Sequence, residues 1–139
     1  ACADAMWASD KASRALGMQI EAVGPGRAVL LMTVRDDMVN GHAICHGGMI
    51  FTLADSAFAF ACNSHNLNAV AAGARIEFLA PGRLGDALTA VAEQVAQGRR
   101  GGVYDVTVTN QDGRVIALFR GNSQRIGGEL VDAQTGEPT

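Results

Sequence analysis

One carboxylate stands out because of the residues around it. Asp55 is the only charged residue in Gly47–Asn63 (GGMIFTLADSAFAFACN), which is otherwise mostly apolar and contains no proline. Burying a carboxylate without partners is costly and raises its pKa, and such groups often act as a base or a nucleophile. Alternatively, Asp55 is hydrogen-bonded to Ser56 or to a partner helix at an interface. We favour the catalytic interpretation, because the charge serves no evident packing purpose.

The glycine pair Gly47-Gly48 opens the same apolar segment. A helix start has backbone N–H groups without internal partners and the positive end of the helix dipole. Glycine lets a ligand approach that backbone closely, so the pair is suited to bind a developing oxyanion. Taken alone, a tight loop-to-helix turn explains both glycines equally well. Beside Asp55, we favour the oxyanion hole.

Two polar residues precede the glycines. Asn40 either orients a water molecule or holds the carboxylate, or it is an ordinary loop asparagine that forms a turn. His46 either donates a hydrogen bond near the reacting oxygen or caps the helix. For His46 we favour the functional role, whereas the residues alone leave both roles of Asn40 open.

Other nucleophile and metal sites are disfavoured. Cys45 lacks an evident base and orienting group, so it ranks below Asp55 as a nucleophile. The spacing of His42, Cys45 and His46 matches no standard zinc pattern, and His65 is expected in a loop. We therefore expect neither a metal nor a cofactor.

The elements that position these residues follow from periodicity and turn signals. A helix is expected at 2–16 and an all-round apolar, hence buried, helix at 47–63. Strands are expected at 18–23, 27–34, 70–79, 86–96, 102–110 and 114–126, with a flexible tail at 127–139. The alanine-rich composition of 86–96 favours a helix, but its alternation favours a strand. Hairpin connections predict an antiparallel sheet, and its apolar face needs a cover. The sequence predicts an α+β fold in which the sheet curls around the 47–63 helix.

The bulk composition restricts the function classes. A chain of 139 residues with 48% hydrophobic and 18% charged residues predicts one globular domain. A net charge of −3 without charge runs argues against nucleic-acid binding, and the longest apolar stretch is too short to span a membrane. Three cysteines at unrelated spacings and the absence of a signal-peptide pattern predict a reducing, cytoplasmic location.

These features together resemble a known family. Asn40, then His46-Gly47-Gly48, then an acidic residue nine positions after the histidine is a pattern similar to that of the phenylacetate-pathway (PaaI-like) thioesterases of the hotdog fold. The run Phe78-Leu79-Ala80-Pro81-Gly82 and the Gly98-Arg99-Arg100 loop also resemble the family. The resemblance covers about residues 10–127 and implies a single hotdog domain over 1–139. It implies hydrolysis of acyl-CoA with Asp55 as nucleophile or general base and with Asn40 in a functional role, as an assisting group.

The resemblance also implies where coenzyme A binds. The expected contacts are Gly48, Ala80, Pro81, Gly82, Arg83, Gly98, Arg99 and Arg100. Coenzyme A carries phosphates, and arginine binds phosphate through paired hydrogen bonds. A solvated basic turn is the alternative for Arg99-Arg100.

Helix geometry adds an expectation about assembly. Gly47 and Asp55 are eight residues apart, which is roughly 12 Å along a helix at about 1.5 Å per residue. Both must reach one thioester group, which a single helix does not allow. Two antiparallel copies related by a dyad near Phe51 do allow it. The resemblance implies the same shared site in a homodimer, and commonly a homotetramer.

The leading interpretation is a thioesterase for phenylacetyl-CoA, its hydroxylated relatives or another aromatic or medium-chain acyl-CoA. A non-catalytic acyl-CoA-binding module is the alternative, but binding an acyl chain needs no buried carboxylate. A hydratase or dehydratase is disfavoured, because the 47–63 segment contains no glutamate.

Overall fold

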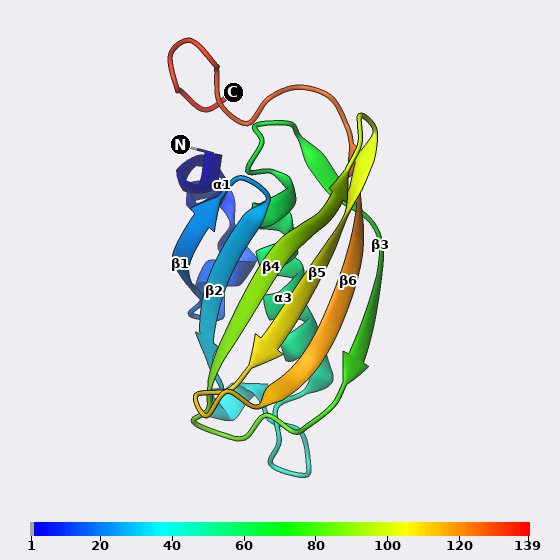
Figure 1. Cartoon of the computed structure of the whole chain (residues 1–139). Coiled ribbons are helices and arrows are strands. Elements are labelled where there is room, and N and C mark those ends of the chain that lie inside the picture. The colour runs from blue at the N-terminus through cyan, green and yellow to red at the C-terminus, as the bar shows by residue number, and fades with distance from the viewer. Residues whose placement is uncertain (1) are drawn as a thin grey trace.

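The computed structural model describes residues 2–139 and shows an antiparallel sheet curled around one long helix, α3 (Gly47–Cys62) (Figure 1). The strands are β1 (Gln19–Gly24), β2 (Arg27–Thr33), β3 (Ala69–Phe78), β4 (Ala87–Gln97), β5 (Gly101–Thr109) and β6 (Val115–Arg125). Their order in the sheet is β1-β2-β4-β5-β6-β3, and each neighbouring pair is antiparallel. The predicted architecture is confirmed, and each strand boundary lies within one residue of its predicted position.

The core lies between the concave face of the sheet and α3. The alternation in β4 places Leu88, Ala90 and Ala92 inward, so the alanine-rich segment is a strand, as its alternation predicts. Phe58 of α3 packs on Tyr104 with ring centroids 5.7 Å apart. A Cβ at Gly121 would lie 2.8 Å from the Phe58 ring, so α3 approaches β6 closely only because that position is glycine.

The sheet covers one side of α3 and leaves the other partly accessible. Leu53, Ala54, Ala57 and Phe58 are fully buried, whereas the side that includes Asp55 is only half-buried. The prediction of a helix buried on all sides is therefore wrong for the single chain. Its apolar composition exceeds what this chain covers by itself.

The N-terminal segment departs from the predicted single helix at 2–16. It forms two helices, α1 (Cys2–Ser9) and α2 (Lys11–Ala15), separated at Asp10. The Asp10 carboxylate accepts hydrogen bonds from the backbone N–H of Ser13 at 2.9 Å and from its hydroxyl at 2.7 Å. Aspartate is a strong N-cap, so Asp10 starts a new helix instead of continuing the first.

The last segment, predicted as a flexible tail at 127–139, runs back past the N-terminal helix (Figure 1). Val131 is 6% exposed, and the Asn66 side chain bonds to the backbone of Leu130 and Val131. This segment therefore contributes to the surface around α1 and α3. In the described residues, no helix has the length and apolar character needed to cross a membrane.

Candidate active site

The first turn of α3 leaves one backbone donor free. The His46 ring accepts a hydrogen bond from the Gly48 N–H through Nδ1 at 3.0 Å, and the Met49 and Ile50 amides donate to the His46 carbonyl. Within residues 2–139, the Gly47 N–H has no acceptor. Gly47 is therefore the donor available for an oxyanion, and His46 is the helix cap, which was the alternative reading of this residue.

The absence of a side chain at Gly48 leaves room for the His46 ring that caps the helix. A Cβ at Gly48 would lie 3.2 Å from Nδ1 of His46, so a larger residue would crowd the capping ring. Because Nδ1 accepts a hydrogen bond, a neutral His46 ring carries its proton on Nε2. At the start of α3, His46 therefore caps the Gly48 N–H, and the Gly47 N–H remains free.

An open cavity of about 540 Å³ lies beside this turn. It is lined by Asn40, Ile44, Cys45, Gly47, Ile50 and the run 78–82. Five of the residues predicted from the sequence are therefore brought together, although they come from three separate segments: Asn40, Gly47, Ala80, Pro81 and Gly82. The Phe78 ring lies over Gly47, whose added Cβ would be 3.0 Å from it.

Asn40 shapes the loop that borders this cavity. Its side-chain Oδ1 accepts hydrogen bonds from the backbone N–H groups of His42 at 2.9 Å and Ile44 at 3.4 Å. The turn-forming role considered for Asn40 is therefore present. Its Nδ2 group has no partner in the described chain, so Asn40 can hold the loop and still donate to a ligand.

Cys45 lines the same cavity but is a poor nucleophile. It is 4% exposed, and burial together with the charge of Asp86 raises the pKa of its thiol to about 11. At physiological pH the Cys45 thiol is therefore neutral, and it is a poor nucleophile because the thiolate is the reactive form.

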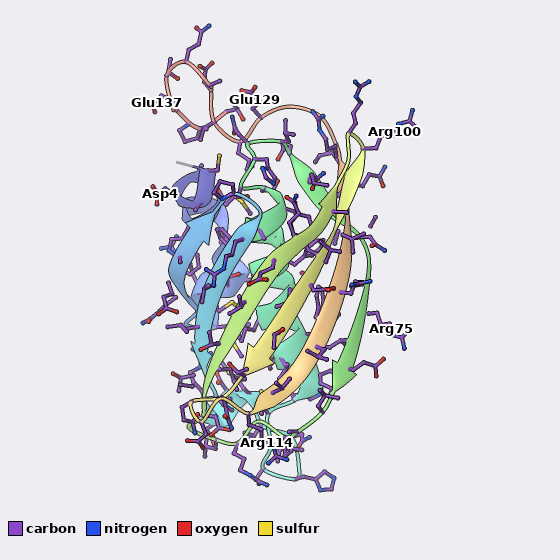
Figure 2. The ribbon with its side chains drawn as sticks, in the orientation of Figure 1. Asp4, Arg75, Arg100, Arg114, Glu129 and Glu137 are labelled. Atoms are coloured by element: carbon purple, nitrogen blue, oxygen red, sulfur yellow. The ribbon has the colours of Figure 1, made fainter. Side chains whose placement is uncertain are left out.

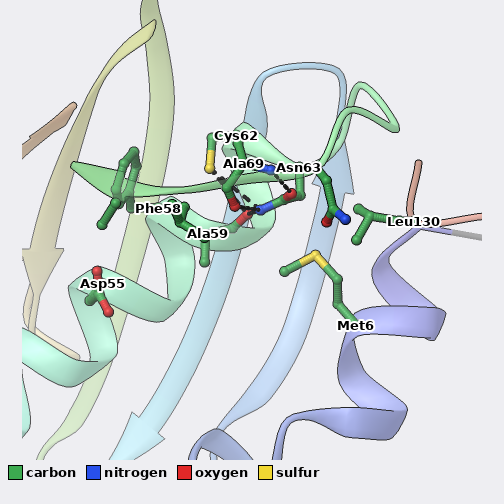
Figure 3. A pocket seen from close by; sticks show the side chains of 11 residues that line it. Met6, Asp55, Phe58, Ala59, Cys62, Asn63, Ala69 and Leu130 are labelled. Carbon is green, nitrogen blue, oxygen red and sulfur yellow. Dashed lines mark hydrogen bonds between the residues drawn. The ribbon is translucent and has the colours of Figure 1, made fainter. Parts of the chain in front are cut away.

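Asp55 faces a second, separate cavity of about 320 Å³, seen from close by in Figure 3. Phe58, Cys62, Asn63, Ala69, Met6 and Leu130 are among its lining residues. Burial raises the pKa of the Asp55 carboxyl above its ordinary value of 3.8. No hydrogen-bond or ion-pair partner of Asp55 is found among residues 2–139, and the predicted alternative of a bond to Ser56 is wrong. Instead, the Ser56 hydroxyl lies 2.8 Å from that of Ser13.

The two cavities have no lining residue in common. A single chain therefore does not bring Gly47 and Asp55 to one point, in agreement with their separation along α3. Sequence reasoning missed Met6 and Leu130, which reach the Asp55 cavity from the two ends of the chain. No local pattern marked them, because only the tertiary fold places them there.

The predicted phosphate-binding arginines lie at two different ends of the sheet. Arg83 pairs with Ile44 beside the Gly47 cavity. Arg99 and Arg100 lie in the β4–β5 hairpin, at the opposite end of the molecule from Arg114 of the β5–β6 hairpin (Figure 2). Both side chains are exposed and have no carboxylate partner in the described chain, so they are available to an anion. The described residues contain no group of three histidine, cysteine or carboxylate side chains placed to hold a metal ion.

Comparison with known proteins agrees with this geometry. Residues 42–117 match the thioesterase superfamily. The chain is 51% identical over 129 residues to the acyl-coenzyme A thioesterase PaaI of Escherichia coli K12, covering 93% of this chain and 92% of that protein. The solved structure of the E. coli PaaI protein from the phenylacetic acid degradation operon superposes with a TM-score of 0.90, at 52% identity, over 91% of this chain and 92% of that one.

A second solved structure, a hypothetical thioesterase protein from Streptococcus pneumoniae TIGR4 with coenzyme A, has a TM-score of 0.78 at 33% identity, covering 81% of this chain and 90% of that one. The likeness thus extends over nearly the whole fold, including both segments that carry the candidate residues. The hotdog fold predicted from the sequence is confirmed, and the chain belongs to the thioesterase superfamily, as a PaaI-like thioesterase.

Proposed function

We propose that this thioester hydrolase cleaves phenylacetyl-CoA, a hydroxylated relative or a related aromatic or medium-chain acyl-CoA, at sites shared between two protomers. The observation that carries the proposal is the pairing of an unpartnered Asp55 in an apolar cavity with a free Gly47 N–H in another. Thioester hydrolysis needs a donor for the oxyanion, which Gly47 can supply, and a base or nucleophile, which Asp55 can supply.

The reaction follows from what these groups can do. The Gly47 N–H donates a hydrogen bond to the carbonyl oxygen, where negative charge develops in the transition state. The Asp55 carboxylate removes a proton from water as the water adds to the carbonyl carbon, or it attacks that carbon itself. When Asp55 acts as the base, the C–S bond then breaks and the departing CoA thiolate takes up the proton that Asp55 removed from water. When Asp55 attacks, the C–S bond breaks to leave an acyl–Asp55 anhydride, and water then hydrolyses this anhydride to the free acid and the Asp55 carboxylate while the CoA thiolate takes up one of the protons released. The Nδ2 group of Asn40 positions the water or the carbonyl, and His46 keeps the start of α3 in place.

A dimer supplies both halves of one site. Strand β3 is at the edge of the sheet, is exposed along most of its length and carries small residues between Ala69 and Ala74. An open edge of this kind is a template for pairing with another strand. Pairing β3 with its copy across a dyad sets the half-buried sides of two α3 helices together, with Gly47 of one near Asp55 of the other. We expect this dimer, and a tetramer built of two such dimers.

Coenzyme A is expected to lie along the Gly47 cavity, against residues 78–82. Gly48 and Arg83 belong to the same protomer as that cavity. In the antiparallel dimer, the Gly98-Arg99-Arg100 hairpin of the other protomer approaches from the opposite end of its sheet. Two protomers thereby offer arginines to the phosphates, in a cytoplasmic enzyme that needs no further cofactor.

Release of free thiol from a panel of acyl-CoA esters tests the proposal. We expect turnover of phenylacetyl-CoA and 4-hydroxyphenylacetyl-CoA, and slower turnover of acetyl-CoA. Tight binding without release would favour the non-catalytic module. Hydration of crotonyl-CoA would favour a hydratase, and it is measured as the loss of the enoyl absorbance. Either result, in place of thiol release, would contradict the proposal.

A further inference from the structure

A chain of hydrogen bonds links a buried tyrosine of the sheet to the hairpin that carries Arg99 and Arg100. Tyr104 of β5 is fully buried, and its ring packs on Phe58 of α3. Its hydroxyl donates to Oε1 of Gln97, the last residue of β4, at 2.6 Å. Burial raises the pKa of the Tyr104 phenol to about 12, so the hydroxyl keeps its proton and remains a donor.

An irregularity in β4 brings Gln97 to the face of the sheet on which Tyr104 lies. Side chains alternate along a strand, so Gln94 and Gln97, three positions apart, would ordinarily point to opposite faces. The register with β5 shifts just after Gln94, which leaves Val95 as an extra residue and reverses the alternation. Both glutamine side chains therefore approach the Tyr104 hydroxyl, with Oε1 of Gln97 at 2.6 Å and Oε1 of Gln94 at 3.5 Å. Gly102 leaves room for this arrangement, because a Cβ there would overlap Oε1 of Gln97.

The carbonyls of three successive hairpin residues are each held by a donor. Nε2 of Gln97 donates to the Gly98 carbonyl at 2.9 Å. On the other side, Arg125 of β6 donates to the Arg99 carbonyl through Nη1 at 3.4 Å. The backbone N–H of Arg125 donates to the Arg100 carbonyl at 2.8 Å. The Gln97 amide is thus bonded at both ends, to the buried phenol and to the hairpin, and it connects the core to the hairpin.

The arginine side chains on this fixed backbone are free. Within residues 2–139, Arg99 and Arg100 have no carboxylate partner, and both are exposed at the end of the sheet, where Figure 2 shows Arg100. A fixed backbone limits the positions that the two guanidinium groups can take before a ligand arrives. Binding then requires less ordering of the loop, which raises the affinity for a phosphate without any new contact.

We propose that Tyr104 and Gln97 are positioning residues that hold the β4–β5 hairpin so that its two arginines meet the phosphates of coenzyme A. This inference rests on the proposed function, and specifically on the assignment of this hairpin to coenzyme A. Both residues act through the hairpin and not on the ligand. Their removal should therefore weaken the binding of the CoA ester without changing the chemical step at Asp55.

The experiment measures KM and kcat for phenylacetyl-CoA and for the phenylacetyl thioester of N-acetylcysteamine, which has no phosphate. The variants are Gln97→Ala and Tyr104→Phe, which keeps the ring on Phe58 and removes only the hydroxyl. Each should raise KM for phenylacetyl-CoA about fivefold, within the range for the net loss of one hydrogen bond. In both variants, kcat and KM for the N-acetylcysteamine thioester should not change.

The matched control is Gln19→Ala. Gln19 is exposed in β1, at an edge of the sheet, and its side chain makes no hydrogen bond to the described residues. This variant should leave KM and kcat for both thioesters unchanged.

Removing the arginines shows whether the effect passes through them. In the double variant Arg99→Ala/Arg100→Ala, the addition of Tyr104→Phe should produce no further rise in KM for phenylacetyl-CoA. A purely structural role of Tyr104 would not give this result, because a general loosening of the sheet would raise KM with or without the arginines.

The outcomes separate this inference from the function on which it rests. If the double arginine variant has a raised KM but Tyr104→Phe or Gln97→Ala does not, the positioning role is overturned and the phosphate site stands. Equal rises for both thioesters, a fall in kcat, or a further rise in KM without the arginines would also overturn it. An unchanged KM in the double arginine variant would overturn the phosphate site and this inference together. Absence of thiol release by the wild-type protein would overturn the proposed function, and this inference with it.

Discussion

The two halves of α3 provide opposite environments on one helix. Its first turn has a free backbone donor at Gly47, beside a cavity lined by the 40–46 loop and residues 78–82. Its middle has a carboxylate without a donor, beside an apolar cavity formed with β3 and the chain ends. One half can stabilise negative charge and the other can supply a base or nucleophile. The two halves complement each other if a second copy of α3 runs beside the first in the reverse direction, which is the arrangement proposed above.

The largest expected effect is the loss of the base or nucleophile. Asp55→Asn keeps the size and shape of the side chain but removes its ability to accept a proton. We expect turnover to fall by roughly 10²–10⁴-fold, the range for one positioned acid–base group. The measurement is kcat for thiol release from the best substrate of the panel. Asp105→Asn, which removes an exposed carboxylate on the other face of the sheet, is the control, and it should change kcat little. Near wild-type turnover in Asp55→Asn would show that the two halves of α3 do not differ in the proposed way.

Mixing two inactive variants tests whether the two halves belong to different protomers. One variant is Asp55→Ala and the other is Gly47→Val, whose side chain would meet the Phe78 ring and block the approach to the N–H. In a mixed dimer with shared sites, one site has both lesions and the other has none. Activity should therefore return on subunit exchange, to about half of the wild-type rate per heterodimer, with statistical mixing lowering the bulk value.

The mixing experiment needs a control that shows folded parent variants and the formation of mixed dimers. Each parent variant must be folded by circular dichroism, and heterodimers must be demonstrated with two affinity tags. If heterodimers form and activity does not return, each site uses Gly47 and Asp55 of the same chain, and the reversed-helix arrangement is wrong.

Much of this contrast is local in the sequence and was therefore predictable. Gly47 at the start and Asp55 in the middle of an apolar run are read directly from spacing, and the strands follow from alternation and from turns such as Asp112-Gly113, where Gly113 has a φ of 78°. The break at Asp10 also had a local signal, since its bonds reach only to Ser13, but helix-forming neighbours masked it.

Other features depend on distant contacts and were not predictable from pattern. Leu130 reaches the Asp55 cavity only because Asn66 binds its backbone from 64 residues away. The partial exposure of α3 has a similar origin, since composition reports how apolar a helix is but not which neighbour covers each side. Conversely, His46 and Asn40 have the local roles, cap and turn, that sequence reasoning weighed and ranked second.

Removing the arginines that are proposed to bind the phosphates of coenzyme A should have a moderate effect on KM. The result tests whether the β4–β5 hairpin end of the sheet contributes to coenzyme A binding. Arg99→Ala and Arg100→Ala should each raise KM for the CoA ester about tenfold, since a charged hydrogen bond is worth roughly 1.5–3 kcal/mol and exposure reduces it. KM for the matching N-acetylcysteamine thioester, which has no phosphate, should not change. Arg27→Ala is the control, because Arg27 already pairs with Glu93 at 3.7 Å. Equal KM values in both variants and the wild type would assign the hairpin to the solvated surface.

The smallest expected effect concerns the stability cost of the Asp55 charge. Because burial raises the Asp55 pKa above 3.8, the folded state binds more protons than the unfolded state between the ordinary and the raised value. Stability therefore falls as pH rises through that window, and the cost persists at neutral pH. Asp55→Asn should raise Tm at neutral pH by a few degrees or less, and the gain should vanish as pH falls toward 3.8. Asp105 has the opposite sign: hydrogen bonds from Arg120 lower its pKa, so Asp105→Asn should lower Tm slightly at neutral pH and lose this effect at low pH. Calorimetric Tm values of both variants across pH measure the difference. A lower Tm for Asp55→Asn at neutral pH would mean that a donor from the second protomer binds the carboxylate, and the middle of α3 would then not be the donor-poor half of the helix.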